Sequence, residues 1–169
     1  MKIILCLCCL AAASARADTV AEPGLRPELQ ADLGLSVVGL GFEYPITGSI
    51  ALQAEAVILR TYFLPWFDLG DDASGFGGGL RGTWFARADG RGLYITPYAR
   101  VARVTAQNPS ASVGVAVEAG AMIGYAFRFF EKLDLRLGGG AQFIYIGGDP
   151  GLHTRVPFLA VDIVVGLRL

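Results

Sequence analysis

Strict alternation of apolar residues with small or polar residues is the feature that most constrains the fold of this chain. Between Ser112 and Phe130, every second residue is apolar. The positions between these apolar residues include Glu118 and Arg128. A period of two is the signature of a β-strand whose two faces differ in chemistry. The run exceeds the about five or six residues of an ordinary strand, and its length suits a tilted strand that crosses a membrane.

The same alternation recurs along most of the chain. The other alternating segments are 38–44, 50–58, 76–87, 93–101, 133–145 and 159–169. The connectors between them differ in length: "PITG", "ADGRG" and "FFEKLD" are short turns, whereas "FLPWFDLGDDASG", "AQNPSAS" and "GGDPGLH" are longer loops. Short turns at one end and long loops at the other are typical of outer-membrane barrels, in which the short turns are periplasmic.

These seven strands leave a closed antiparallel barrel one strand short, because such barrels have an even number of strands. The eighth must come from "LRPELQADLGLSVV", in which the alternation slips in phase between Leu35 and Val38. We predict a short first strand near 25–33 followed by a tight turn, with a bulged single strand or a short plug helix as alternatives. The fold class is therefore all-β: an up-and-down antiparallel transmembrane β-barrel of eight strands over residues 28–169.

The first 17 residues predict a secretory signal peptide: a positive start, an apolar stretch, and small residues at Ala15 and Ala17. Cleavage is expected after Ala17, and a short buried element is the alternative. All three cysteines lie in this segment, so the mature chain would hold no disulfide.

The polar segment 18–27 is interpreted as a periplasmic lead-in. No run of 18 apolar residues follows residue 17, and a net charge of −1 gives no indication of nucleic-acid binding.

The apolar faces are expected to point outward into lipid. Aromatic residues gather at both ends of the apolar rows, as in the aromatic girdles of membrane barrels. The alternative is a soluble, lipocalin-like barrel that buries these rows around a ligand. Such a barrel would carry a densely charged outer face, whereas the opposite face here consists mostly of glycine, alanine and threonine.

A small set of charged residues alternates with the apolar rows and is therefore expected inside the barrel. An eight-stranded barrel is just wide enough for its interior to be filled by side chains, and an unpaired charge there would be costly. We interpret the set as a structural hydrogen-bonded network, with a gated ion path or a proton relay as the alternative. The predicted network is Glu55, Arg81, Arg100, Glu118, Arg136 and Asp162.

Three arginines break the rule of an uncharged outer face: Arg60, Arg103 and Arg155. All three fall at the long-loop end of their segments, where lipopolysaccharide of the outer leaflet carries phosphates. Arginine suits phosphate geometry, so lipopolysaccharide contact is one hypothesis. Ordinary snorkelling of arginine at the rim of the membrane is the other.

Few residues offer catalytic chemistry. The single histidine, His153, lies in a loop near Asp149, and Ser110 and Ser112 lie in another loop. A catalytic site needs a nucleophile, a base and an orienting group within mutual reach, and nothing in the sequence fixes such a geometry. We therefore expect no enzymatic activity, no metal site and no cofactor.

The glycine-rich strands, the hairpin stretches "VGLGFEYPITGSIALQAEA" and "GLYITPYARV", and the final "LAVDIVVGLRL" resemble small eight-stranded outer-membrane barrels. That group includes the transmembrane domain of outer membrane protein A and its OmpX-like and opacity-type relatives. The resemblance implies a monomer in the bacterial outer membrane that contacts lipid and lipopolysaccharide and is inserted by the barrel-insertion machinery. In the family the last strand carries the insertion signal, which here would comprise Val161, Ile163, Val165, Leu167 and Leu169.

The family's last strand usually ends in an aromatic residue, whose place Leu169 takes here. Members of the family serve as structural proteins, adhesins, host-interaction proteins or narrow pores. We therefore expect a non-enzymatic barrel with a structural or surface-interaction role. A narrow ion-permeable channel is the first alternative, and a lipid-modifying enzyme that uses His153 at the rim is the second.

Overall fold

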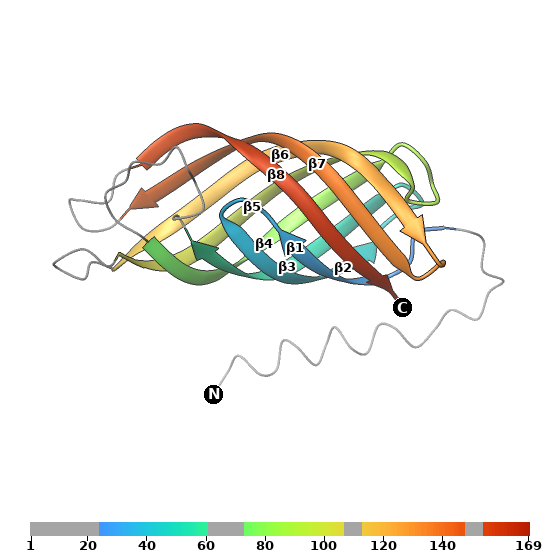
Figure 1. Cartoon of the computed structure of the whole chain (residues 1–169), viewed down its shortest axis with the longest axis horizontal. Helices are drawn as coiled ribbons and strands as arrows, with labels where there is room; N and C mark the ends of the chain where they lie inside the picture. The colour runs from blue at the N-terminus through green and yellow to red at the C-terminus, as the bar shows by residue number, and fades with distance from the viewer. Residues whose placement is uncertain (1–23, 61–72, 107–112, 148–153) are drawn as a thin grey trace.

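The structure, a computed structural model, describes residues 24–60, 73–106, 113–147 and 154–169, except for the side chains at 73, 106 and 154–158. Eight antiparallel strands in chain order close into an up-and-down barrel (Figure 1). The strands are β1 Glu28–Leu33, β2 Val37–Pro45, β3 Ile50–Arg60, β4 Ala73–Phe85, β5 Gly92–Ala106, β6 Val113–Phe129, β7 Leu133–Gly147 and β8 Thr154–Arg168. The predicted fold class and strand number are confirmed.

Several predictions fall on residues outside the described ranges. The signal peptide with its cleavage site lies there, as do His153 and the loop residues considered beside it. The described part of the lead-in, residues 24–27, forms no strand or helix. No helix among the described residues is long and apolar enough to cross a membrane.

The barrel is closed by its first and last strands. β1 pairs with β8, so that Leu29 lies opposite Leu167 and Ala31 opposite Val165. The backbone N–H of Leu169 donates to the carbonyl oxygen of Pro27 at 3.0 Å, which extends the pairing beyond both strands. The final strand is therefore paired on both edges, with β7 on one side and β1 on the other.

The phase slip near residue 35 is a tight turn between two strands. β1 ends at Leu33, and the N–H of Gly34 donates to the carbonyl oxygen of Val37 at 2.8 Å. β2 begins at Val37 and pairs back along β1, with Leu33 opposite Val38. The segment thus forms the predicted short strand and turn, and neither the bulged strand nor the plug helix.

Side chains alternate between the outside and the inside of the barrel along each strand. In β3, exposed and buried residues alternate without exception from Ile50 to Arg60. The exposed rows are apolar: Leu40 is 72% and Phe76 71% accessible. In β8, Ile163, Val165, Leu167 and the adjoining Leu169 are exposed on the same outer surface, and Val161 is partly exposed. The apolar face of the sheet therefore lies outside.

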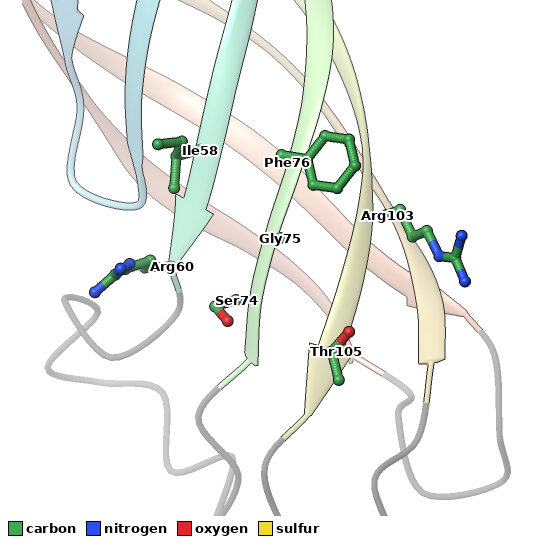
Figure 2. Close-up of a pocket in the computed structure, with 7 residues that line it drawn as sticks. All are labelled: Ile58, Arg60, Ser74, Gly75, Phe76, Arg103 and Thr105. Atoms are coloured by element: carbon green, nitrogen blue, oxygen red, sulfur yellow. The ribbon is translucent and has the colours of Figure 1, made fainter.

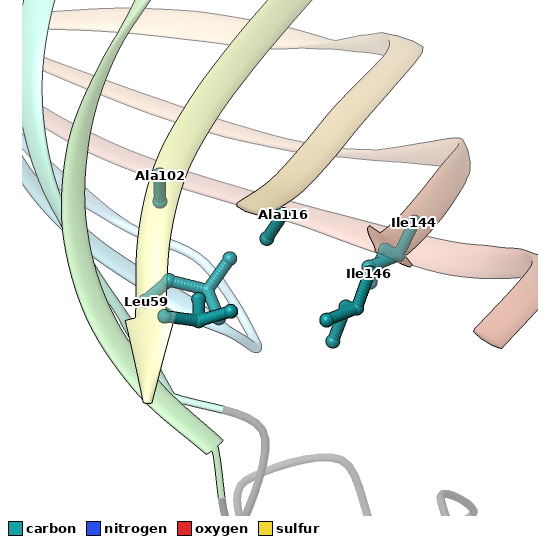
Figure 3. Close-up of a cluster of buried hydrophobic side chains, with 6 residues drawn as sticks. Leu59, Ala102, Ala116, Ile144 and Ile146 are labelled. Carbon is teal, nitrogen blue, oxygen red and sulfur yellow. The ribbon is translucent and has the colours of Figure 1, made fainter. Parts of the chain in front are cut away.

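The interior changes in character along the barrel axis. At the end that carries the connectors 61–72, 107–112 and 148–153, here called the long-loop end, buried apolar side chains form a cluster (Figure 3). Its members are Leu59, Ala102, Val104, Ala116, Ile144 and Ile146. A second apolar cluster lies toward the opposite, short-turn end and consists of Ala51, Phe85, Tyr94 and Ala126, against which Leu25 packs. Charged side chains lie between these clusters and also at the short-turn end, where the guanidinium carbon of Arg136 lies 4.9 Å from the ring centre of Phe85.

Candidate functional site in the barrel interior

Arg81 lies at the centre of the interior charges. Its Nη1 donates to Oδ2 of Asp32 at 2.6 Å and its Nη2 donates to Oδ1 of Asp162 at 2.7 Å. The hydroxyl of Tyr94 donates to the other oxygen of Asp162 at 2.6 Å. Arg81 is 2% and Asp162 0% accessible. This chain of contacts joins β1, β4, β5 and β8 across the lumen.

Arg100 connects the same group to two further carboxylates. Its Nε donates to Oε1 of Glu55 at 2.6 Å, and its Nη2 donates to Asp32. Its Nη1 lies 3.6 Å from Oε2 of Glu118. The guanidinium also stacks over the ring of Tyr98, with its carbon 4.6 Å from the ring centre. We call Asp32, Glu55, Arg81, Arg100, Glu118 and Asp162 the central network.

Glu118 is the least satisfied carboxylate of the central network. Its Oε1 accepts a hydrogen bond from the Ser36 hydroxyl at 3.2 Å, while its Oε2 has no hydrogen-bond partner among the described residues. The side chain is 1% accessible. The central network holds four carboxylates and two guanidinium groups, whereas the sequence predicted three of each. The interior charges are therefore not balanced within this layer.

The imbalance arises because Arg136 lies elsewhere. Its two terminal nitrogens donate to the two carboxylate oxygens of Glu43, each at 2.7 Å, and Nη2 also donates to Glu28 at 3.0 Å. Arg128 holds Asp134 through two hydrogen bonds of 2.8 and 2.9 Å. Together with Arg168, whose Nε lies 3.7 Å from Glu28, these residues form the short-turn cluster: Glu28, Glu43, Arg128, Asp134, Arg136 and Arg168. This cluster contains three acids and three bases.

The structure thus divides the six interior residues expected to form one network. It brings Glu55, Arg81, Arg100, Glu118 and Asp162 together and places Arg136 with different partners. Sequence reasoning missed Asp32 and the two acids that bind Arg136. Glu43 did carry a signal, since it alternates with the outward Phe42 and Tyr44 and therefore had to face inward.

The outward arginines Arg60 and Arg103 lie beside one groove on the outside of β3, β4 and β5 (Figure 2). The side chain of Arg155 lies outside the described part of the structure. Within the described residues, no group of three or more histidine, cysteine, aspartate or glutamate side chains could hold a metal ion.

The closed sheet of eight strands has an apolar outer surface and an ionic interior. These features define the class: a small β-barrel of the transmembrane type. In fold, the chain is similar to the crystal structure of Neisserial surface protein A, with a TM-score of 0.50 and 14% sequence identity over 85% of this chain and 94% of that chain. It is also similar to the N-terminal β-barrel domain of Pseudomonas aeruginosa OprF, with a TM-score of 0.49 and 15% identity over 85% of this chain and 96% of that one. No protein-family model and no curated protein sequence matches the chain. The closed eight-stranded barrel and the similarity to the Neisserial structure confirm, at the level of the fold, the predicted resemblance to small eight-stranded barrels.

Proposed function

We propose that this chain is an integral protein of the bacterial outer membrane, without enzymatic activity, that serves a structural or surface-interaction role. The observation that carries the proposal is the direction of the side chains. Large apolar residues cover the outside, while charged residues such as Arg81 and Asp162 are buried inside. Such a surface has no favourable contact with water, but it matches the hydrocarbon layer of a membrane. The similar Neisserial structure is that of a surface protein, which agrees with this role.

The packing of the lumen supports a structural role over transport. The apolar cluster with Leu59 and Ile146 lies toward the long-loop end, and the central network lies below it. The ion pairs of Arg81 and Arg100 then join strands on different sides of the barrel. Because an eight-stranded barrel leaves room for little more than such side chains, the interior acts as a packed core that holds the cylinder together.

A narrow cation-selective path is the second candidate, and the charge imbalance of the central network favours it. Four acidic side chains against two guanidinium groups give this layer a surplus of acids, and those that are ionised attract cations and repel anions. Current recorded across a planar bilayer in a salt gradient tests this candidate. A reversal potential shifted toward the equilibrium potential of the cation supports a cation path. A current no larger than that of the bare bilayer rejects it.

The primary proposal is tested by membrane fractionation of expressing cells together with gel mobility of unheated and boiled samples. We expect the protein in the outer-membrane fraction and a faster-migrating unheated band, because a closed barrel resists detergent until it is heated. Recovery in the soluble fraction, with the same mobility before and after boiling, contradicts the proposal.

A further inference from the structure

A groove of about 480 Å³ lies on the outer surface at the long-loop end of β3, β4 and β5 (Figure 2). The strand register arranges its residues in two adjacent rows. Arg60 lies opposite Ser74 and Ser74 opposite Thr105, while Ile58 lies opposite Phe76 and Phe76 opposite Arg103. The row nearer the loops is thus polar, and the next row is apolar except for Arg103. The outward position that follows Phe76 on β4 is Gly78, which adds no side chain beside the groove.

The charges of this groove are unusual for the surface on which they lie. Among the strand side chains that the structure describes, Arg60 and Arg103 are the charged ones that face outward. Arg103 makes no hydrogen bond or ion pair with any described residue. A charged side chain that faces lipid is costly near the middle of the bilayer and tolerated near its interface. Arg60 is the last residue of β3 and Arg103 lies near the end of β5, so both lie at the long-loop end rather than in the middle of the barrel wall.

The groove joins two kinds of contact that fit one kind of molecule. The guanidinium groups can bind phosphate oxygens through paired hydrogen bonds, and the hydroxyls of Ser74 and Thr105 can donate to the same group. Ile58 and Phe76, which are 53% and 71% accessible, offer an apolar surface for an acyl chain. Figure 2 shows Arg60 and Arg103 on opposite sides of the groove with Ser74, Phe76 and Thr105 between them. Two separated arginines suit a ligand with two separated phosphates.

We propose that this groove is a binding site for the bis-phosphorylated glycolipid of the outer leaflet, the lipid A part of lipopolysaccharide. The inference rests on the proposed membrane location, which places the long-loop end at the outer leaflet. It goes beyond that location because it assigns the binding of lipid A phosphates to one side of the barrel. Among the described strand residues, the remainder of the outer surface carries no charged side chain.

The test compares lipid A binding by the wild-type barrel and two double variants in nonionic detergent, measured by native mass spectrometry. Arg60→Gln with Arg103→Gln removes the charges of the groove. Arg87→Gln with Arg91→Gln is the matched control, because it removes two exposed arginines from the turn at the other end of the β4–β5 pair. The ligands are bis-phosphorylated lipid A, its dephosphorylated form, and inorganic phosphate.

We expect the groove variant to bind bis-phosphorylated lipid A at least about tenfold more weakly than the wild type, since each lost phosphate contact of roughly 1.4 kcal/mol is a factor of ten. The control should bind as the wild type does, dephosphorylated lipid A should bind weakly to all three proteins, and inorganic phosphate should not bind. Equal binding by the groove variant and the control overturns the proposal, and so does equal binding of the dephosphorylated lipid.

Two further results separate this inference from the proposed function. If the groove variant keeps its heat-dependent gel shift but loses no affinity, the lipid site is wrong while the membrane barrel stands. If the groove variant fails to fold, Ser74→Ala with Thr105→Val gives a second test, because it removes two hydroxyl donors without changing charge. That variant should bind bis-phosphorylated lipid A more weakly than the control, and unchanged binding rejects the site.

Discussion

At the residue scale, the stability of this barrel depends on guanidinium groups that each hold more than one carboxylate. Arg81 pairs with Asp32 and Asp162, and Arg100 pairs with Asp32 and Glu55. Asp32 accepts from both arginines, so that it joins the two ion pairs into one unit. Removing one partner of a buried ion pair leaves an uncompensated charge, which is far more damaging than the loss of the pair's own attraction.

Replacing Arg81 should therefore destabilise the barrel strongly. Arg81→Met keeps an unbranched but shorter side chain and removes the guanidinium group that Asp32 and Asp162 share. We expect a loss of about 3–5 kcal/mol in the free energy of unfolding, measured by urea titration of the refolded barrel in detergent. Arg87→Met is the control, because the Arg87 side chain is 66% accessible, and an exposed ion pair contributes less than about 1 kcal/mol. Equal losses of stability in the two variants would show that the buried ion pairs of Arg81 do not stabilise the barrel.

Glu118 should respond differently to two substitutions. Glu118→Ala leaves the Ser36 hydroxyl without its acceptor and creates a space beside Arg100, so we expect about 1–3 kcal/mol of destabilisation and a lower temperature for the gel shift. Glu118→Gln keeps an acceptor for Ser36 and removes one of the surplus negative charges, so it should retain the wild-type heat resistance. An unchanged gel shift in Glu118→Ala removes Glu118 from the network.

Alternation alone was enough to predict that five charges of the central network face inward, but not which charges meet. Glu55, Arg81, Arg100, Glu118 and Asp162 were assigned to the interior because each lies between outward apolar neighbours. Asp32 was missed because it precedes the phase slip, in a strand of six residues that offers little pattern to read. The separation of Arg136 from the others could not be predicted, because contacts across a lumen depend on the stagger and tilt of all the strands.

At the element scale, glycine pairs in neighbouring strands make room for interior side chains. Gly124 on β6 lies opposite Gly138 on β7. A Cβ atom built at either position would lie 2.6 Å from the hydroxyl oxygen of Tyr94, closer than real contacts allow. The bare backbone at this point therefore allows Tyr94 to reach Asp162 and complete the hydrogen bonding of that carboxylate.

Gly138→Ala should push Tyr94 away from Asp162 and weaken the barrel by about 1–3 kcal/mol, the usual effect of overpacking a close-packed interior. Gly139→Ala is the matched control, because a Cβ atom at this neighbouring outward position meets its nearest atom, the carbonyl oxygen of Ala160, at 3.5 Å. Urea unfolding of both variants in the same detergent measures the difference. Equal stability of the two would mean that the Gly124–Gly138 pair has no packing role.

The turn between β4 and β5 carries a carboxylate that should titrate below its ordinary range. Partial burial raises the pKa of Asp89, but hydrogen bonds from the backbone N–H of Arg91 and from the Arg87 side chain outweigh this effect, so the pKa is lowered overall. The stabilisation from ionised Asp89 is thus present above the ordinary carboxyl range and is lost as pH falls through the lowered folded-state pKa. An NMR titration of the Asp89 carboxyl carbon should give a higher pKa in Arg87→Met than in the wild type. An identical titration curve would remove the side chain of Arg87 as a cause.

At the scale of the whole molecule, it was possible to predict the order and number of the strands and which of their faces points outward. Alternation with a period of two residues runs through nearly the whole sequence and indicates all three. The strand before the phase slip follows from closure, because β8 needs a second partner and the segment Glu28–Leu33 supplies it. The layering of the lumen into an apolar cluster, a negative central network and a balanced short-turn cluster was not predictable. It depends on the axial position of each inward residue after the strands have tilted.

The central claim, that the apolar face of the barrel contacts lipid, is tested most directly at Trp84. This side chain is 48% accessible on the outer surface, and Trp66→Phe makes it the sole tryptophan of the chain. The barrel is reconstituted in bilayers that carry bromine on their acyl chains, and the emission of Trp84 is compared with that in unbrominated bilayers and with added iodide. We predict blue-shifted emission that brominated lipid quenches strongly and iodide quenches weakly. Red-shifted emission that iodide quenches and that brominated lipid leaves unchanged would contradict this claim. A purified protein that stays monodisperse in buffer without detergent would contradict it as well.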